Sequence, residues 1–122
     1  MVKILIVDDD HTMAGLLKTL LELDGYDVVH DIREGSLVST VRSEKPDVIL
    51  MDIFMIDSDG LELLVELRAE KDLADTRIVM TSGMELSEQA AAAGADAFLL
   101  KPYTPDQLIS AIRGDTDVSG SG

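Results

Sequence analysis

The chain has 122 residues, no cysteine and a formal net charge of −14 at pH 7. This length suits one domain with its own core, and the lack of cysteine excludes a disulfide framework and a thiolate metal site. The acidity argues against direct contact with nucleic acid, which requires clustered Lys and Arg. The apolar runs are too short for membrane insertion or a signal peptide, so we expect a soluble, cytoplasmic protein.

The first half of the chain alternates short apolar runs with amphipathic segments, the pattern of repeated strand–helix units. The predicted strands cover residues 3–7, 27–32 and 47–52. The predicted helices are a long one over residues 11–24 and a weaker one around Leu37, Val38 and Val41. Apolar side chains at helical spacing predict that one face of the first helix enters the core. These side chains are Met13, Leu16, Leu17, Leu20 and Leu21.

The second half continues the same alternation. Its predicted strands cover residues 77–82 and 97–100, and its predicted helices are a leucine-rich segment at 61–67 and an alanine-rich one at 85–93. A last helix is predicted to begin with Thr104 as N-cap and Pro105 at the first helical position. Residues 1–113 therefore form one predicted domain, and the glycine- and serine-rich residues 114–122 are typical of a flexible, linker-like tail.

Five strands that alternate with five helices predict an α/β fold. Right-handed crossovers wind such units into a three-layer αβα sandwich around a doubly wound parallel sheet. The nearly continuous apolar run over residues 47–52 agrees with this fold, because a central parallel strand is covered on both faces.

Polar residues stand at the points where four of the predicted strands end. In an open α/β sheet the carboxyl ends of the strands form the edge at which ligands bind. We therefore expect these side chains to share one pocket. They are Asp8, Asp9, Asp10, Asp52, Thr81, Ser82 and Lys101.

The chemistry of these side chains favours a divalent cation and a phosphoryl group. Carboxylates crowded together require a cation or a shifted pKa, and oxygen ligands suit Mg²⁺ or Mn²⁺. Lys101 can pair with a carboxylate or a phosphoryl oxygen, and the Ser82 hydroxyl beside Gly83 can hold another oxygen. A carboxylate can also act as a nucleophile and become an aspartyl phosphate.

Over residues 2–113 the chain resembles the receiver domains of two-component response regulators. The shared motifs occur in order along the chain, and none is decisive by itself. They are the Asp8-Asp9 pair, Asp52 within MDIFMIDSDGLEL, Gly60 eight residues later, Ser82-Gly83, GADAFLLKPY, and Lys101-Pro102. The resemblance implies a flavodoxin-like, five-stranded sheet with the strand order 2-1-3-4-5.

Carried over position by position, the resemblance implies that Asp52 is the phosphoacceptor. It also implies a Mg²⁺ site, with Mn²⁺ possible, at this carboxylate. The ligands would be Asp8, Asp9, Asp52 and the backbone carbonyl of Phe54.

The resemblance further assigns Ser82 and Lys101 to the phosphoryl group, with Thr81 as an alternative to Ser82 at the hydroxyl position. Ser82 and Phe98 would be the switch residues. The peptide bond between Lys101 and Pro102 would be cis, a state that is rare outside X–Pro bonds.

As a function, the resemblance implies a phosphorelay switch. The phosphoryl group would come from a histidine kinase or a histidine phosphotransfer protein. The face built by the fourth helix, the fifth strand and the fifth helix would then change for a partner. This partner would be a downstream protein or an effector domain outside this sequence. Such a domain catalyses only its own phosphotransfer and autodephosphorylation, so we do not expect an ordinary enzyme.

Two other functions remain as alternatives. One is a receiver-like interaction module that works without phosphorylation, against which the intact set of Asp and Lys residues argues. The other is a Mg²⁺-dependent α/β phosphohydrolase, but Leu61 stands where the loop of haloacid-dehalogenase-type phosphatases has Thr. Ile56 replaces the proline that is usual in receiver domains, a change that removes no ligand. We expect no special role for His11 and His30.

Overall fold

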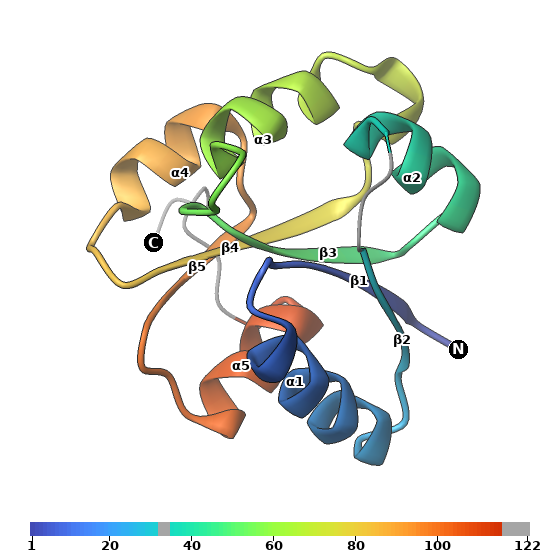
Figure 1. Ribbon diagram of the computed structural model, residues 1–122, viewed down its shortest axis with the longest axis vertical. Coiled ribbons are helices and arrows are strands. Elements are labelled where there is room, and N and C mark those ends of the chain that lie inside the picture. The colour runs from blue at the N-terminus through green and yellow to red at the C-terminus, as the bar shows by residue number, and fades with distance from the viewer. Residues whose placement is uncertain (32–34, 116–122) are drawn as a thin grey trace.

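One parallel sheet organises the molecule, for which a computed structural model describes residues 1–31 and 35–115. The strands pair in the order β2-β1-β3-β4-β5, and every pair is parallel. This confirms the predicted doubly wound sheet and its strand order (Figure 1). The strands are β1 (Lys3–Val7), β2 (Asp27–His30), β3 (Val48–Asp52), β4 (Arg77–Ser82) and β5 (Ala97–Leu100).

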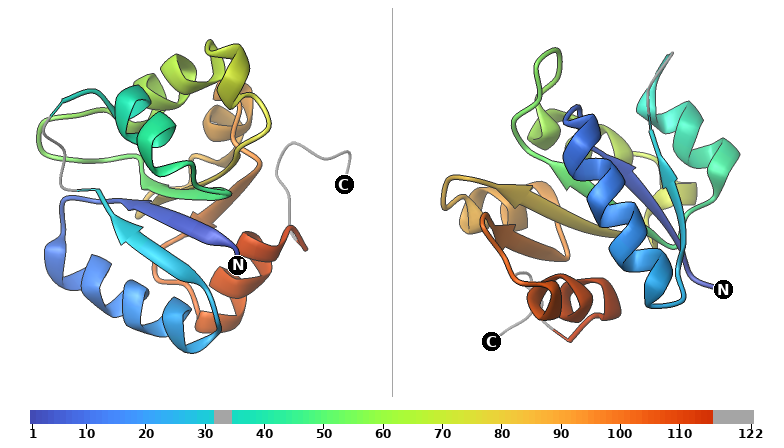
Figure 2. Two further views of the ribbon diagram at one scale, coloured as in Figure 1. Left: turned by 90° about the vertical axis from the view of Figure 1, so that its right-hand side faces the viewer. Right: turned by 60° about the horizontal axis from the view of Figure 1, so that its bottom comes forward.

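Helices cover both faces of this sheet. They are α1 (His11–Leu23), α2 (Leu37–Glu44), α3 (Gly60–Arg68), α4 (Ser87–Ala93) and α5 (Pro105–Arg113), with a short 3₁₀ helix η1 (Lys71–Leu73). The helices α2, α3 and α4 lie on one face, and α1 and α5 lie side by side on the other (Figures 1 and 2). The predicted three-layer sandwich is therefore confirmed. None of the helices within the described residues is long and apolar enough to cross a membrane.

Two apolar clusters, one on each face, form the core. The cluster under α1 and α5 includes Ile4, Ile6, Leu17, Leu21, Leu50, Val79 and Leu108. The cluster under α2, α3 and α4 includes Leu5, Val7, Ile49, Met51, Leu64, Ile78 and Met80. Alternate residues of the central strands enter opposite clusters, as the two-residue period of a strand requires. Burial on both faces explains why these strands are apolar throughout.

The first helix differs from its prediction in which side chains it buries. It begins at His11 as expected, with the Asp10 carboxylate accepting the backbone N–H of Met13 at 3.0 Å. Its last helical residue is Leu23, one position before the predicted end at residue 24. Gly25 follows shortly after the helix with φ +93°. Leu16, predicted in the core, is 63% exposed. The five predicted positions span more of the helix than the sheet can cover, so the outer part of the stripe faces solvent.

Other boundaries differ by one or two residues. The fourth helix begins at Ser87 rather than residue 85, because the Glu85 carboxylate accepts the Ser87 backbone N–H at 2.8 Å and so holds a turn. The third strand begins at Val48 rather than residue 47. The second strand ends at His30, and its predicted last residue, 32, lies outside the described residues. The predicted tail falls mostly on residues 116–122, which also lie outside them.

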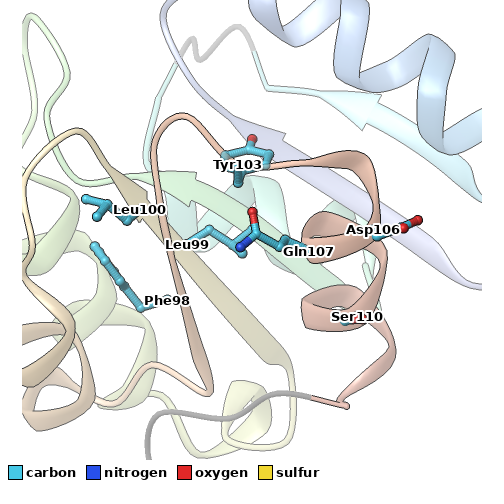
Figure 3. A pocket seen from close by; sticks show the side chains of 7 residues that line it. All are labelled: Phe98, Leu99, Leu100, Tyr103, Asp106, Gln107 and Ser110. Carbon is cyan, nitrogen blue, oxygen red and sulfur yellow. The ribbon is translucent and has the colours of Figure 1, made fainter.

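An open groove runs between the edge strand β5 and helix α5, with a volume of about 350 Å³. We call it the β5–α5 groove (Figure 3).

Thr104 fixes the start of α5, the helix that borders this groove. The Thr104 hydroxyl accepts the backbone N–H of Gln107, and the Gln107 side chain accepts the backbone N–H of Thr104. This capping box, with Pro105 in the first turn, confirms the predicted start of the last helix.

Candidate functional site

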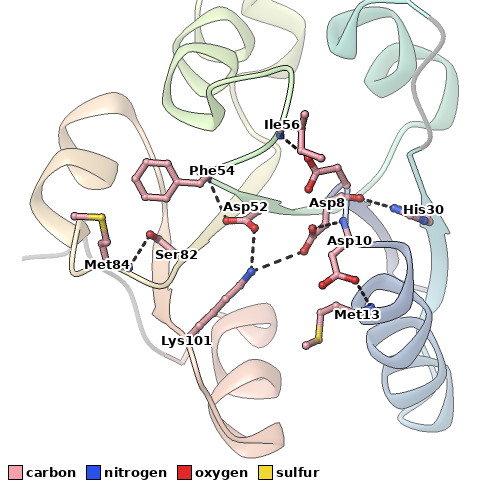
Figure 4. A network of polar contacts seen from close by, with 11 residues as sticks. Asp8, Asp10, Met13, His30, Asp52, Phe54, Ile56, Ser82, Met84 and Lys101 are labelled. Atoms are coloured by element: carbon pink, nitrogen blue, oxygen red, sulfur yellow. Dashed lines mark hydrogen bonds and ion pairs between the residues drawn. The ribbon is translucent and has the colours of Figure 1, made fainter.

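The register of the sheet brings the predicted site residues to one edge. Val7 pairs with Met51, Met51 with Met80, and Met80 with Phe98, so four strands are level with one another. The residues that follow these positions therefore come out at the same end of the sheet, which we call the carboxyl edge. Figure 4 shows the side chains that meet there. They include Asp8, Asp52, Ser82 and Lys101.

Asp52 is the last residue of β3, and each of its two carboxylate oxygens contacts another group. Its Oδ2 forms an ion pair with Lys101 Nζ at 2.9 Å, and its Oδ1 accepts the backbone N–H of Phe54 at 3.3 Å. The side chain is 11% exposed. The carboxylate is therefore oriented by a cation and a backbone donor while it retains an open side toward solvent.

Asp8 lies beside this ion pair and is almost completely buried. Its Oδ2 is 4.0 Å from Lys101 Nζ, and its Oδ1 accepts the backbone N–H of Asp10 at 2.9 Å. Burial raises the pKa of the Asp8 carboxyl, against the lowering effects of the Asp10 N–H and of Lys101. The environment therefore opposes a negative charge at Asp8, and a nearby cation would stabilise that charge.

Asp9 is exposed and turns toward the β3–α3 loop, where its Oδ2 accepts the backbone N–H of Ile56 at 2.5 Å. Within the described residues, no three Asp, Glu or His side chains are arranged as a finished metal site. The donors at the carboxyl edge are nevertheless all oxygens, from Asp8, Asp9 and Asp52. Such a donor set fits Mg²⁺ or Mn²⁺, which also keep several water ligands.

Gly60 explains how the β3–α3 loop can close against Asp52. A Cβ atom at this position would lie 2.4 Å from the Asp52 backbone oxygen and 2.7 Å from Ile53 Cα. The backbone N–H of Gly60 donates to the Ile53 carbonyl at 2.8 Å. A side chain at Gly60 would therefore push α3 away from the end of β3, which gives a physical reason for glycine at this spacing.

The fourth strand ends with two buried hydroxyl residues, Thr81 and Ser82. The Ser82 oxygen accepts the backbone N–H of Met84 at 3.0 Å, and Figure 4 shows it near Asp52. Thr81 is the residue that pairs with Asp52 across the two strands. Phe98 is half-buried on β5 and packs against the cluster under α2, α3 and α4. The switch roles of Ser82 and Phe98 stay predictions.

The chain leaves β5 through Lys101 and Pro102, and the peptide bond between them is cis. Tyr103 follows and is half-buried. Its burial, together with the negative charges of Asp8 and Asp52, raises the pKa of the phenol to about 12. Tyr103 therefore stays neutral at physiological pH and lies between the carboxylates and the β5–α5 groove, which it also lines.

His30 is a site residue that the sequence did not indicate. It ends β2, and its Nε2–H donates to the backbone oxygen of Asp8 at 2.7 Å. The ring of His11 packs edge-to-face against it, with 5.2 Å between the ring centroids. His30 thus holds the backbone of Asp8 from the side opposite Lys101. His30 and Asp8 are 22 positions apart in the sequence, and no local motif links them.

Comparison with known proteins points to one family. A family model described as the response regulator receiver domain matches residues 4–113. The chain is 35% identical to the chemotaxis protein CheY of Bacillus subtilis, over 91% of this chain and 94% of that protein. It is 36% identical to the transcriptional regulatory protein KdpE of Staphylococcus aureus, over 91% of this chain and 48% of that protein.

Solved structures give the same result. A CheY-like receiver domain protein from Methanospirillum hungatei superposes with a TM-score of 0.83 at 31% identity, covering 94% of this chain and 93% of that one. Chemotaxis protein CheY4 of Vibrio cholerae superposes with a TM-score of 0.83 at 26% identity, covering 93% of this chain and 97% of that one. The chain spans about half the length of several curated relatives, including the transcriptional regulators, whereas it matches the CheY proteins over nearly their whole length.

Proposed function

The chain belongs to the response regulator receiver domain family, and on that premise we propose that Asp52 is its phosphoacceptor. The phosphoryl group would come from a histidine kinase or a histidine phosphotransfer protein. The observation that carries the proposal is the ion pair between Asp52 Oδ2 and Lys101 Nζ at 2.9 Å, beside the buried carboxylate of Asp8. Receiver domains are regulatory proteins rather than classical enzymes, so the expected output is a change of partner.

In the transfer step, a carboxylate oxygen of Asp52 forms a bond to phosphorus as the P–N bond of the donor phosphohistidine breaks. The imidazole leaves and takes up a proton from solvent. Lys101 lies where it can neutralise phosphoryl oxygens, since its Nζ is already 2.9 Å from the attacking carboxylate. The Phe54 N–H orients that carboxylate, and the Ser82 hydroxyl would bind a phosphoryl oxygen.

The carboxylates Asp8, Asp9 and Asp52, with the backbone carbonyl of Phe54, would hold Mg²⁺, or Mn²⁺ in its place. The ion supplies positive charge that offsets the charge spread over the phosphoryl oxygens. The fit is supported by the oxygen-only donor set and by the buried position of Asp8, where burial raises the pKa of the carboxyl.

Phosphorylation would then shift an existing two-state equilibrium on the face formed by α4, β5 and α5. Ser82 and Phe98 would be the residues that respond. A phosphoryl group shifts such an equilibrium only if it interacts better with one of the two states. The output would pass to a downstream protein or to an effector domain, with residues 114–122 as the linker. A cytoplasmic location stays a prediction from the sequence.

Intact-protein mass spectrometry after incubation with acetyl phosphate and Mg²⁺ tests this proposal. We expect a gain of one phosphoryl group in the parent protein and none in Asp52→Asn. Asp57→Asn is the matched control, because Asp57 is an exposed carboxylate in the following loop. Equal gain in the parent and in Asp52→Asn would contradict the assignment.

A receiver-like module that acts without phosphorylation is the second candidate. The contact of Asp9 favours it, because this carboxylate accepts the Ile56 N–H. Such a module would ignore Mg²⁺ and acetyl phosphate and still bind its partner. A phosphohydrolase would instead turn over many equivalents of a small phosphomonoester, which a steady-state assay with p-nitrophenyl phosphate would detect.

A further inference from the structure

Another pocket lies between α2 and the short helix η1, and we call it the α2–η1 pocket. Its volume is about 440 Å³, which is within the range of sites for small molecules. Pro46 and Thr76 line it and lie shortly before β3 and β4 in the chain. The pocket is therefore at the end of the sheet opposite the carboxyl edge, away from Asp52. Figure 1 shows α2 beside the segment that follows α3.

The floor of this pocket is apolar and is held in place by the core. Val41 and Leu73, which line it, are 1% and 7% exposed, and both belong to the cluster under α2, α3 and α4. Pro46 lies beside them and is also buried. Such a floor gains free energy when it covers an apolar group, but it selects only weakly among apolar ligands. The choice of ligand therefore depends on the polar groups at the rim.

Arg42 is a rim cation whose charge is already matched. Its Nε and Nη2 donate to the two carboxylate oxygens of Asp72 at 2.9 and 3.0 Å, and Nη2 also donates to a Glu70 oxygen at 2.5 Å. The hydrogen bonds from Arg42 lower the pKa of the Asp72 carboxyl, so this group stays ionised at neutral pH. This network joins α2 to η1 at the rim of the pocket. Because two carboxylates share one guanidinium, it offers no unmatched positive charge to an anion.

Lys45 is a rim cation without such a match. It is the C-cap of α2, and within the described residues its ammonium group makes no ion pair or hydrogen bond. The neighbouring carboxylate of Glu44 is paired with Lys3 Nζ at 3.0 Å. Lys45 has φ +51°, the only positive φ of a non-glycine residue in the described part of the chain. A residue with a Cβ adopts this left-handed backbone at a cost, so backbone geometry alone would favour glycine here.

The unmatched polar groups of the pocket are therefore one ammonium and one hydroxyl. Thr76 lines the pocket, and its hydroxyl makes no hydrogen bond to any of the described residues. A single carboxylate can accept from both Lys45 and Thr76, whereas the second charge of a phosphate would be repelled by the carboxylates of Asp72 and Glu70. The net charge of −14 repels anions in general, so the binding of one depends on a local cation without a partner.

We propose that the α2–η1 pocket binds a small monocarboxylate with an apolar body. Lys45 and Thr76 hold the carboxylate, and the floor of Val41, Pro46 and Leu73 covers the apolar body. The site goes beyond the proposed function, because it lies at the other end of the sheet and does not depend on phosphoryl transfer. Apolar burial supplies most of the affinity, and the ammonium group selects the charge of the ligand.

Titrations of the full, unphosphorylated chain, followed by ¹H–¹⁵N correlation NMR spectra at constant ionic strength, test this site. The probe is 3-phenylpropanoate, and we expect a Kd on the order of 1 mM, as is usual for a ligand of about eleven non-hydrogen atoms. The amide signals of Val41, Lys45, Leu73 and Thr76 should shift. In 3-phenylpropanamide and 2-phenylethyl phosphate a neutral or doubly charged head replaces the carboxylate, and acetate has the carboxylate without the apolar body. Each of these three should bind at least fivefold more weakly.

Four variants separate the charge of Lys45 from its place at the end of α2. Lys45→Gln and Lys45→Gly should each raise the Kd for 3-phenylpropanoate at least fivefold, whereas Lys45→Arg should raise it less than twofold. Lys45→Gly should not lower the thermal midpoint, because glycine adopts a positive φ without strain. Lys18→Gln makes the same change in net charge at an exposed position of α1 and should change the Kd less than twofold.

Failure of 3-phenylpropanoate to give saturable shifts would overturn the proposal, as would shifts that centre on the carboxyl edge. Equal affinity for the amide or the phosphate ester would show that the pocket does not recognise a carboxylate. Equal losses in Lys18→Gln and Lys45→Gln would reduce the effect to net charge. Full binding by the Lys45→Gly protein would leave Lys45 as a residue that only offsets the dipole at the end of α2, and would also contradict the site.

Discussion

The two ends of the sheet use charged residues in opposite ways. At the end where the strands begin, which we call the amino edge, the arginine side chains are matched by acceptors. Arg68 donates to the backbone oxygens of Gly94, at 2.9 Å, and Thr76, at 2.7 Å, and to the Asp96 carboxylate at 2.8 Å. At the carboxyl edge, the carboxylates of Asp8 and Asp52 share Lys101, at 4.0 Å and 2.9 Å from its Nζ (Figure 4). Balanced charge at the amino edge stabilises the fold, whereas excess negative charge at the carboxyl edge leaves capacity to bind a cation and a phosphoryl group.

Arg68→Met gives the largest expected effect. Arg68 joins the end of α3 to the loops before β4 and β5, and its side chain is only 18% exposed. Its loss leaves the Asp96 carboxylate without this cation and should lower the free energy of unfolding by about 3 kcal/mol. Urea denaturation followed by circular dichroism measures the change.

Arg113→Met is the control for that experiment, because Arg113 is 63% exposed and its ion pair is 3.8 Å long. We expect it to change the free energy of unfolding by less than about 0.5 kcal/mol. The affinity for Mg²⁺ should stay unchanged in both variants. Equal destabilisation by the two substitutions would remove the distinction between a buried network and surface charge.

Mg²⁺ should stabilise the fold through the carboxyl edge. If the ion binds only the folded state, a concentration of about 100 times its Kd adds about 2.7 kcal/mol to the free energy of unfolding. Asp52→Asn should lose most of this gain, whereas Asp57→Asn, at an exposed loop position, should keep it. Thermal unfolding with and without Mg²⁺ measures the gain. The metal site is wrong if Mg²⁺ leaves the thermal midpoint of the parent unchanged.

Gly60→Ala should damage both stability and chemistry. The added Cβ would meet the Asp52 backbone oxygen at 2.4 Å, so the strand end or α3 must move. Overpacking of this kind costs about 2 kcal/mol. We also expect slower phosphorylation by acetyl phosphate, because the displaced residue is the phosphoacceptor itself.

Gly15→Ala is the matched control. Gly15 lies in the middle of α1 with nothing within 4 Å of an added Cβ. Alanine there should raise the free energy of unfolding by about 0.5 to 1 kcal/mol, since glycine is unfavourable inside a helix. A destabilised Gly15→Ala, or a harmless Gly60→Ala, would contradict the steric account of the loop.

Apart from the control substitutions, the smallest expected effect is that of His30. His30→Ala removes the donor that holds the Asp8 backbone, which should cost about 1 kcal/mol and weaken Mg²⁺ binding. Isothermal titration with Mg²⁺ measures the second effect. His30→Gln keeps an N–H donor and should recover much of the affinity, and His11→Ala should change little. If the His30→Gln protein binds Mg²⁺ as weakly as the His30→Ala protein, the contact of His30 with the Asp8 backbone has no positioning role.

Local patterns in the sequence predicted most of the fold. The strands β4 and β5 have the predicted bounds, because a buried parallel strand has apolar residues on both faces and so stands out in the sequence. The start of α5 followed from Thr104 and Pro105, whose roles depend only on neighbouring residues. The prediction that Leu16 lies in the core was wrong. The helical spacing of apolar residues gives the direction of the buried face of α1, but it does not give the width of the face that the sheet covers.

The site was predictable only where strand ends determine it. Asp52 and Lys101 were expected together because parallel strands finish at one edge, and their separation of 2.9 Å agrees with this. The contact of His30 with Asp8 and the contact of Asp9 with Ile56 were not predictable. They join a side chain to a backbone group across 22 and 47 positions of the chain, and no pattern of residue types marks such a contact.

The most direct test of the central claim is to locate the phosphoryl group in the folded protein. The parent is incubated with acetyl phosphate and Mg²⁺, reduced with borohydride to convert acyl phosphate to homoserine, digested and sequenced by tandem mass spectrometry. We predict homoserine at Asp52 alone. Homoserine at Asp8, Asp9 or Asp57, or at no position in a protein that remains folded, would contradict the assignment of the carboxyl edge as a phosphoacceptor site.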